Sequence, residues 1–170
     1  MTRQLLAFAR KQELSPTVVE LNQAVETSSR LLRQLTPPRI DLKLSLSPAP
    51  VPVLVDRSQL EQVLLNLVVN SRDAIDRNGS ITLSTWNSDS TGALQVTDTG
   101  SGIPEDVLPH IFDPFFSTKS PETGTGLGLA TIYGIVSQSG GSIAVHSTVN
   151  VGTTMTVALP TAELPGSANH

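Results

Sequence analysis

The chain contains no cysteine, few aromatic residues and no excess of basic charge. Without cysteine it can form no disulfide framework, no thiolate metal site and no cysteine nucleophile. Aromatic residues make up only 4% of the sequence, so aliphatic side chains must fill most of the core. Eleven basic and fifteen acidic residues give a net charge of -4, which argues against a general nucleic-acid-binding surface.

Long apolar runs are also missing, because none approaches the roughly 20 residues that a membrane-spanning helix needs. We therefore expect no membrane contact by this chain, although the full protein can still be anchored in a membrane. The length of 170 residues and the apolar share of 38% suit one domain with a core of its own. The lack of cysteine fits a cytoplasmic setting.

The hydrophobic pattern predicts helices mixed with strands rather than a regular βαβ series. Helices are expected over residues 2–11, 21–35, 58–77 and 128–138, with a further helix start at Pro104, and strands over 42–46, 51–55, 80–86, 93–97, 142–147 and 153–159. This order favours an α+β fold, a two-layer α/β sandwich in which helices cover one face of a mixed, mostly antiparallel sheet.

The helix over residues 58–77 has the strongest pattern. Ser58 and Glu61 fit a capping box at the start of this helix, and Asp56 to Gln59 fit almost as well. Asn78-Gly79 is expected to end the helix. Leucines and valines, together with Ser71, fall on the face that is expected to pack on the sheet.

Two asparagines and an aspartate lie on another side of this helix. Asn66, Asn70 and Asp73 fall within an arc of about 60° at helical spacing. The stripe is either the solvated side of an amphipathic helix or a set of oxygen atoms that helps to coordinate a hard cation such as Mg²⁺.

Asp98 ends an expected strand and is followed by Gly100 and Gly102. A carboxylate in this position can accept a hydrogen bond from an exocyclic amine such as adenine N6, and glycines leave room for a flat ring. The alternative is an Asx-type turn, in which Asp98 bonds its own backbone. The following Ile103-Pro104 suggests an apolar wall, which favours a pocket.

A second glycine run, Gly124 to Leu129, precedes an expected helix. The N–H groups and the partial positive charge of a helix N-terminus attract anions such as phosphates. The spacing fits neither a Walker A loop nor a dinucleotide fingerprint. A flexible loop is the alternative, but the leucines between the glycines favour a packed segment. Lys119 can reach a terminal phosphate or remain solvated.

In this order the motifs resemble the catalytic ATP-binding domain of sensor histidine kinases, within the GHKL group and its Bergerat ATP-binding fold. The matching segments are Leu65 to Ala74 (N box), Asp98 to Pro104 (G1 box), Ile111 to Lys119 (F box), Gly124 to Leu129 (G2 box), and Gly152 to Thr154 with Leu159-Pro160 (closing strand). The similarity covers residues 42–160, and four boxes in order are highly specific.

The resemblance implies ATP and Mg²⁺ as cofactors. Asn70, helped by Asn66, would bind Mg²⁺, and Asp98 would bind adenine. The other implied nucleotide-binding residues come from the same boxes: Asp73, Gly100, Gly102, Ile103, Phe112, Lys119, Gly124, Thr125, Gly126, Leu127, Gly128 and Leu129. Residues 117–125 would form a short lid that Phe112 and Phe115 anchor.

The resemblance also implies the reaction. Relatives that hydrolyse ATP carry a glutamate four residues before the metal asparagine, and this chain has Asn66 there, an amide without useful basicity. Efficient hydrolysis is therefore not expected, whereas transfer of the γ-phosphate to a histidine on a dimerisation hairpin is. His110, His146 and His170 all lie away from the early helix, so no residue of this chain is assigned a catalytic role.

The implied organisation has three parts. Residues 1–14 are the truncated end of the second dimerisation helix, 15–160 the catalytic ATP-binding domain and 161–170 a flexible tail. Without the acceptor histidine, the fragment is not expected to phosphorylate itself. Implied partners are the dimerisation hairpin of the same protein and a response regulator or receiver domain, in a bacterial cytoplasm. Two alternatives remain. One is another GHKL member, either a serine protein kinase or an ATPase, and the other is a non-catalytic nucleotide-binding module.

Overall fold

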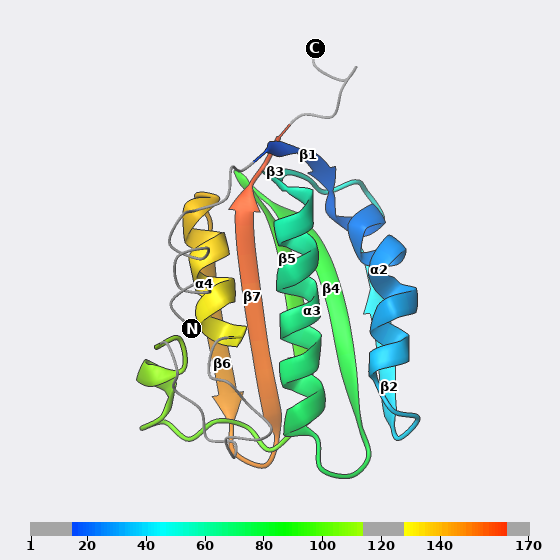
Figure 1. Ribbon diagram of the computed structural model, residues 1–170, viewed down its shortest axis with the longest axis vertical. Coiled ribbons are helices and arrows are strands. Elements are labelled where there is room, and N and C mark those ends of the chain that lie inside the picture. Colours follow the sequence, from blue (N-terminus) through cyan, green and yellow to red (C-terminus); the bar gives the residue numbers. More distant parts are fainter. Residues whose placement is uncertain (1–14, 114–127, 163–170) are drawn as a thin grey trace, which may run out of the picture.

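The computed structural model describes residues 15–113 and 128–162 of the chain and has two layers (Figure 1). One layer is a five-stranded sheet, and the helices α2, α3 and α4 all lie on the same face of it. The α+β sandwich expected from the sequence is confirmed.

The main sheet has the strand order β2-β4-β5-β7-β6. The bounds of these strands are Ile40–Ser45, Gly79–Ser88, Thr91–Asp98, Gly152–Pro160 and Ser142–Thr148. β2 and β4 run parallel, and the other neighbouring pairs are antiparallel. A parallel pair needs a crossover connection, and the chain between β2 and β4 supplies it with β3 and α3.

A second, two-stranded sheet pairs β1 (Pro16–Glu20) with β3 (Pro52–Asp56). The sequence pattern predicts no strand before residue 21, because Pro16 interrupts it. Proline is tolerated as the first residue of a strand, where its missing N–H removes no ladder bond. Thr161 forms an isolated bridge to Val53, and Ala162 N donates to Pro52 O at 3.0 Å, so the start of the expected tail lies against this sheet.

The helices bury aliphatic stripes against the main sheet. α2 (Leu21–Leu35) and α4 (Gly128–Gln138) have the bounds expected from periodicity. α3 (Arg57–Ala74) lies between them in Figure 1 and has the longest buried stripe: Leu60, Val63, Leu64, Leu67, Val68 and Ser71. Removing these side chains from water is the main favourable contribution to this packing.

The structure decides between the two expected caps of α3 and corrects its C-terminal end. Asp56, rather than Ser58, is the N-cap, because its carboxylate accepts hydrogen bonds from Ser58 N at 2.9 Å and Gln59 N at 3.2 Å. The helix ends at Ala74 instead of Arg77. Gly79 begins β4 and does not end the helix.

The helix start expected at Pro104 is also wrong. Val107 N and Leu108 N donate to Pro104 O at 3.0 and 3.1 Å, which makes a turn, and a short 3-10 helix η1 (Leu108–His110) follows. Pro109 has no N–H to donate to Glu105 O, so an α-helical ladder cannot continue through this position.

Some expectations fall on residues 1–14, 114–127 and 163–170, outside the described part of the chain. They include the early helix, most of the F box and most of the second glycine run. Among the residues that are described, no helix is both long and apolar enough to cross a membrane.

Candidate nucleotide-binding site

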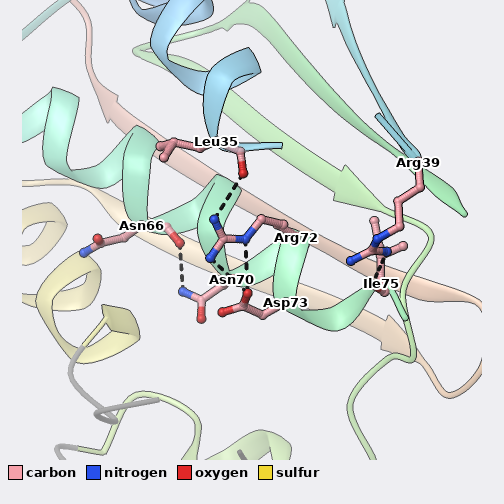
Figure 2. Close-up of polar contacts among 7 residues, drawn as sticks. All are labelled: Leu35, Arg39, Asn66, Asn70, Arg72, Asp73 and Ile75. Carbon is pink, nitrogen blue, oxygen red and sulfur yellow. Dashed lines mark hydrogen bonds and ion pairs between the residues drawn. The ribbon is translucent and has the colours of Figure 1, made fainter. Parts of the chain in front are cut away.

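The C-terminal half of α3 carries the asparagine stripe to the start of α4. Asn66 Nδ2 donates to Gly128 O at 3.3 Å, and Gly128 is the first residue of α4. Asn70 Nδ2 donates to Asn66 O at 2.8 Å, as Figure 2 shows. A β-carbon on Gly128 would lie 3.4 Å from Asn70 Nδ2. Both asparagines therefore lie beside the helix N-terminus that the second glycine run precedes.

The same helix contacts Asp98 through its buried face. Asp98 is the last residue of β5 and only 5% exposed. Its Oδ1 accepts hydrogen bonds from Gly100 N at 2.8 Å and Thr153 N at 3.3 Å, and the Ser71 side chain also hydrogen-bonds the carboxylate. The bond to Gly100 is that of an Asx turn, whereas Ser71 and Thr153 connect Asp98 to α3 and β7.

Burial raises the pKa of Asp98, and the hydrogen bonds from Gly100, Ser71 and Thr153 act in the opposite direction. Burial disfavours a charged carboxylate because it removes water from around it. A carboxylate in this condition gains from any further donor, such as an amine of a bound ligand.

The glycines after Asp98 allow backbone segments to approach closely. A β-carbon on Gly100 would lie 2.6 Å from Ala74 O, at the end of α3. Gly102 has a φ of +78°, and a β-carbon there would lie 2.2 Å from Thr148 O. Both contacts are below the separation that real β-carbons reach, so protein backbone, rather than the expected flat ring, accounts for glycine at these two positions.

The turn after Asp98 is held between α3 and the β6–β7 hairpin. Ser101 N donates to Ala74 O at 2.9 Å, and Asn150 N donates to Ser101 O at 2.7 Å. Ile103 N donates to Ser147 Oγ at 2.7 Å. The position of this turn therefore depends on two other parts of the chain, α3 and the β6–β7 hairpin.

Two other predicted residues pack around the start of α4. Phe112 lies with its ring centroid 5.4 Å from that of Tyr133, a half-exposed residue of α4. Phe112 and Leu129 also pack against the hydrophobic core. The described end of the F box is thus attached to α4.

Asp73 follows Asn70 by one helical turn on the polar stripe of α3. Its Oδ1 lies 3.1 Å from Arg72 Nη2. It borders a groove of about 530 Å³ between the C-terminal ends of α2 and α3, together with Gln34, Leu35, Pro37, Arg39, Arg72, Ile75 and Asp76. Asn66 thus contacts the start of α4, and Asp73 borders this groove.

The remaining predicted site residues, Lys119, Gly124, Thr125, Gly126 and Leu127, lie outside the described residues. In the described part of the chain, no group of three or more histidine, cysteine, aspartate or glutamate side chains could hold a metal ion. A cation beside α3 would therefore take amide oxygens from the protein and most other ligands from elsewhere.

Sequence reasoning missed Ser71 and Thr153 as partners of Asp98 and assigned Ser71 to the packing face. One signal was available, because a serine on an otherwise aliphatic stripe needs a hydrogen-bond partner once it is buried. Which partner it finds depends on how α3 sits on β5, and the sequence does not contain that information in a local pattern.

Comparison with known proteins identifies the family and supports the fold. Residues 55–163 match the family model described as "Histidine kinase-, DNA gyrase B-, and HSP90-like ATPase". The Sensor kinase CckA of Brucella abortus is 43% identical over 175 residues, which cover 94% of this chain and 18% of the relative. The chain thus spans less than a fifth of that curated relative.

Solved structures agree with this match. Full-length ShkA, solved in complex with AMPPNP, superimposes with a TM-score of 0.81 at 27% identity, over 96% of this chain and 36% of that one. The histidine kinase ThkA in complex with the response regulator protein TrrA gives a TM-score of 0.74 at 25% identity. The match covers 95% of this chain and 46% of the ThkA chain.

The matched region contains both ends of the site, from the cap of α3 to the closing strand β7. The chain therefore belongs to the histidine kinase-, DNA gyrase B- and HSP90-like ATPase family, and it is the catalytic ATP-binding domain of a two-component sensor histidine kinase.

Proposed function

We propose that the whole protein transfers the γ-phosphoryl group of ATP to a histidine on its own dimerisation hairpin. The phosphoryl group then passes to a response regulator or a receiver domain. The complex of ThkA with TrrA supports the second step for a related kinase. For this chain, the observation that carries the proposal is that one helix, α3, hydrogen-bonds Asp98 at one end of the site and Gly128 at the other.

At the base end, Asp98 accepts a hydrogen bond from the exocyclic amine of adenine. Ser71 and Thr153 hold its carboxylate in place from α3 and β7. Gly100 and Gly102 shape the turn, and Ile103 contributes its apolar wall. The burial that raises the pKa of Asp98 also excludes water, which strengthens a hydrogen bond to a ligand.

At the phosphate end, the N-terminus of α4 faces the anionic tail of the nucleotide, with Gly128 and Leu129 as its first residues. Gly124, Thr125, Gly126 and Leu127 bring further backbone N–H groups, Lys119 reaches a terminal phosphate, and Phe112 anchors the lid. Asp73 lies one helical turn beyond Asn70 on α3 and contributes a carboxylate to the same polar stripe.

Asn70, helped by Asn66, would hold Mg²⁺. The residues fit this ion, because amide oxygens are hard ligands and Mg²⁺ is commonly bound by one or two protein oxygens plus substrate phosphates. Asn70 uses its amide nitrogen to bond Asn66 O, which turns its amide oxygen away from Asn66. When bound, the ion would neutralise phosphate charge.

The residue at the position that would activate water disfavours efficient hydrolysis of ATP. Asn66 occupies it, and its amide donates to Gly128 O and accepts from Gln62 Nε2 at 3.2 Å. An amide does not accept a proton from water at neutral pH, so it cannot act as a general base. Phosphoryl transfer needs positioning and charge neutralisation more than a strong base, which favours a kinase over an ATPase.

Labelling with γ-³²P-ATP tests this proposal. The 170-residue chain should bind ATP with Mg²⁺ without labelling itself, and adding the dimerisation hairpin of the same protein should yield acid-labile phosphohistidine on the hairpin. Acid-stable phosphoserine, or rapid phosphate release without transfer, would identify another member of the group. Label on His110, His146 or His170 would contradict the proposal as well.

Calorimetric titration with a non-hydrolysable ATP analogue tests the cofactors independently of transfer. We expect binding that becomes tighter in the presence of Mg²⁺ and is weakened by Asn70→Ala only when Mg²⁺ is present. Equal weakening with and without the ion would remove Asn70 from the metal site.

A further inference from the structure

Arg39 lies outside residues 55–163 and outside each of the nucleotide-binding motifs. We propose that Arg39 is a positioning residue for the adenine end of the site, which it holds through the connector between α3 and β4. This inference rests on the proposed function only in naming adenine as the ligand.

The first step is the contact between Arg39 and the connector, residues 75–78. Arg39 Nη1 donates to Ile75 O at 2.7 Å and to Arg77 O at 2.5 Å, and Figure 2 shows the guanidinium reaching Ile75. The backbone of Arg39 also accepts from Gly79 N at 3.1 Å. Carbonyl groups just past a helix end lack helical partners and favour a cation, so Arg39 stabilises this connector in one conformation.

The second step is the contact between the connector and the turn after Asp98. Ser80 N donates to Thr99 Oγ1 at 3.0 Å, and Thr99 N donates to Ser80 O at 3.2 Å. A β-carbon on Gly79 would lie 2.6 Å from Thr99 Oγ1. At the other end of the connector, Ala74 O accepts from Ser101 N. The turn is thus built against both ends of the segment that Arg39 holds.

Arg39 acts on Asp98 only through the connector, because its side chain donates to Ile75 O and Arg77 O and not to Asp98. If the connector moves, Ala74 and Gly79 move with it, and Thr99 to Ser101 lose the surface on which they rest. The Asp98 carboxylate is bonded to Gly100 N within this turn, so its direction changes too. Small displacements of a binding group reduce affinity because hydrogen bonds weaken steeply with misalignment.

Arg33 provides a matched control. It is also an arginine near the end of α2, and its Nη1 donates to a backbone carbonyl, Leu42 O, at 2.8 Å. That carbonyl belongs to β2 and not to the connector. Loss of Arg33 removes a comparable bond without releasing residues 75–78.

Calorimetry with a non-hydrolysable ATP analogue on the 170-residue chain tests the inference. Arg39→Gln should weaken binding about tenfold and Arg33→Gln less than about twofold, while Arg39→Lys, which keeps a cationic donor, should recover most of the affinity. In an Asp98→Asn background, Arg39→Gln should have almost no further effect, since the group that it positions is gone. Equal weakening in both backgrounds, or by both arginine variants, would overturn the inference.

Amide hydrogen exchange without nucleotide separates this inference from the proposed function. Arg39→Gln should speed exchange at Ser101 N relative to a core amide such as Val157 N, and Arg33→Gln should leave that ratio unchanged. If the unmodified chain binds no adenine nucleotide, the proposed function fails while the exchange ratio still decides the role of Arg39. An unchanged ratio in Arg39→Gln overturns the inference whatever the affinities are. If Arg39→Gln does not fold, Arg39→Met replaces it in both measurements, with Arg39→Lys still expected to behave like the unmodified chain.

Discussion

Asp56 and Asp98 occupy equivalent positions in two different parts of the molecule. Asp56 is the last residue of β3 and Asp98 the last residue of β5. Each accepts a hydrogen bond from the backbone N–H two residues further on, at 2.9 Å from Ser58 and 2.8 Å from Gly100. Judged by these local contacts alone, the two turns are alike.

Their surroundings shift the two pKa values in opposite directions. Hydrogen bonds from the Ser58 side chain and the Ser15 backbone N–H lower the pKa of Asp56. They outweigh burial, which raises it. Burial is the largest influence on Asp98 and raises its pKa. Asp56 remains partly in contact with solvent at the start of α3, whereas α3, β5 and β7 enclose Asp98.

The difference shows how one local motif serves two purposes. The Asp56 carboxylate is ionised at little cost and satisfies N–H groups at the start of α3, so it contributes to stability. Burial raises the pKa of Asp98, so ionising this carboxylate costs free energy in the folded protein, and a ligand that donates to it can offset that cost. Burial, rather than sequence context, separates the structural carboxylate of Asp56 from the one that we propose binds adenine.

The largest expected difference between the two aspartates is in nucleotide affinity. Asp98→Asn should weaken ATP binding by about 10- to 100-fold, because it removes a charge-assisted hydrogen bond and presents an amide to the adenine amine. Asp56→Asn should change the dissociation constant by less than about twofold, since asparagine is also a good N-cap. Isothermal titration calorimetry of both variants measures this, and equal losses would erase the contrast.

The residue two positions after each aspartate gives the next largest effect. Gly100→Ala should lower the free energy of unfolding by about 2 kcal/mol, because its β-carbon would press on Ala74 O. Ser58→Ala removes a surface hydrogen bond to Asp56, and we expect a loss below about 1 kcal/mol. Urea denaturation of the two variants decides the order, and a smaller loss in Gly100→Ala would show that the turn can move away from α3.

The aspartates should also differ in their effect on stability at neutral pH. Asp56→Ala should lower the free energy of unfolding by about 1 kcal/mol through loss of the helix cap. Asp98→Asn should leave it unchanged or raise it, because a buried charge is removed. Thermal melts without nucleotide compare them, with Glu20→Ala, the N-cap of α2, as a matched control for capping. Strong destabilisation by Asp98→Asn would assign Asp98 a structural role.

The smallest expected effect is the pH dependence of stability. Asp56 has a lowered folded-state pKa, so its contribution is complete above the unfolded-state pKa and is lost as the pH falls through the folded-state value. Asp98 has a raised pKa, so its penalty is present above the folded-state value and disappears as the pH falls toward the unfolded-state value.

Denaturation from neutral pH down to well below the usual carboxyl pKa of about 4 measures both contributions, because Asp98 acts above that value and Asp56 below it. On acidification the unmodified chain should lose stability relative to Asp56→Asn and gain it relative to Asp98→Asn. Differences of the same sign for both variants would show that the two carboxylates have similar surroundings.

Much of the fold could be predicted from the sequence because its signals are local. α2 and α4 have the predicted bounds, since periodic apolar residues and terminal proline or glycine act within a few residues. Predictions failed where two local signals compete. Asp56 and Ser58 can both cap α3, and proline at residue 16 is compatible with the first position of a strand, which makes β1 easy to miss.

The order and chemistry of the nucleotide-binding motifs were determined by the sequence alone, because amides at helical spacing and glycines after Asp98 are properties of short segments. Only the tertiary structure decided which of these groups meet. Asn66 reaches Gly128 across 62 positions of the chain, and Ser71 and Thr153 meet Asp98 from α3 and β7. Such pairs depend on how helices pack on a twisted sheet, and burial, which arises only from that packing, made Asp98 unlike Asp56.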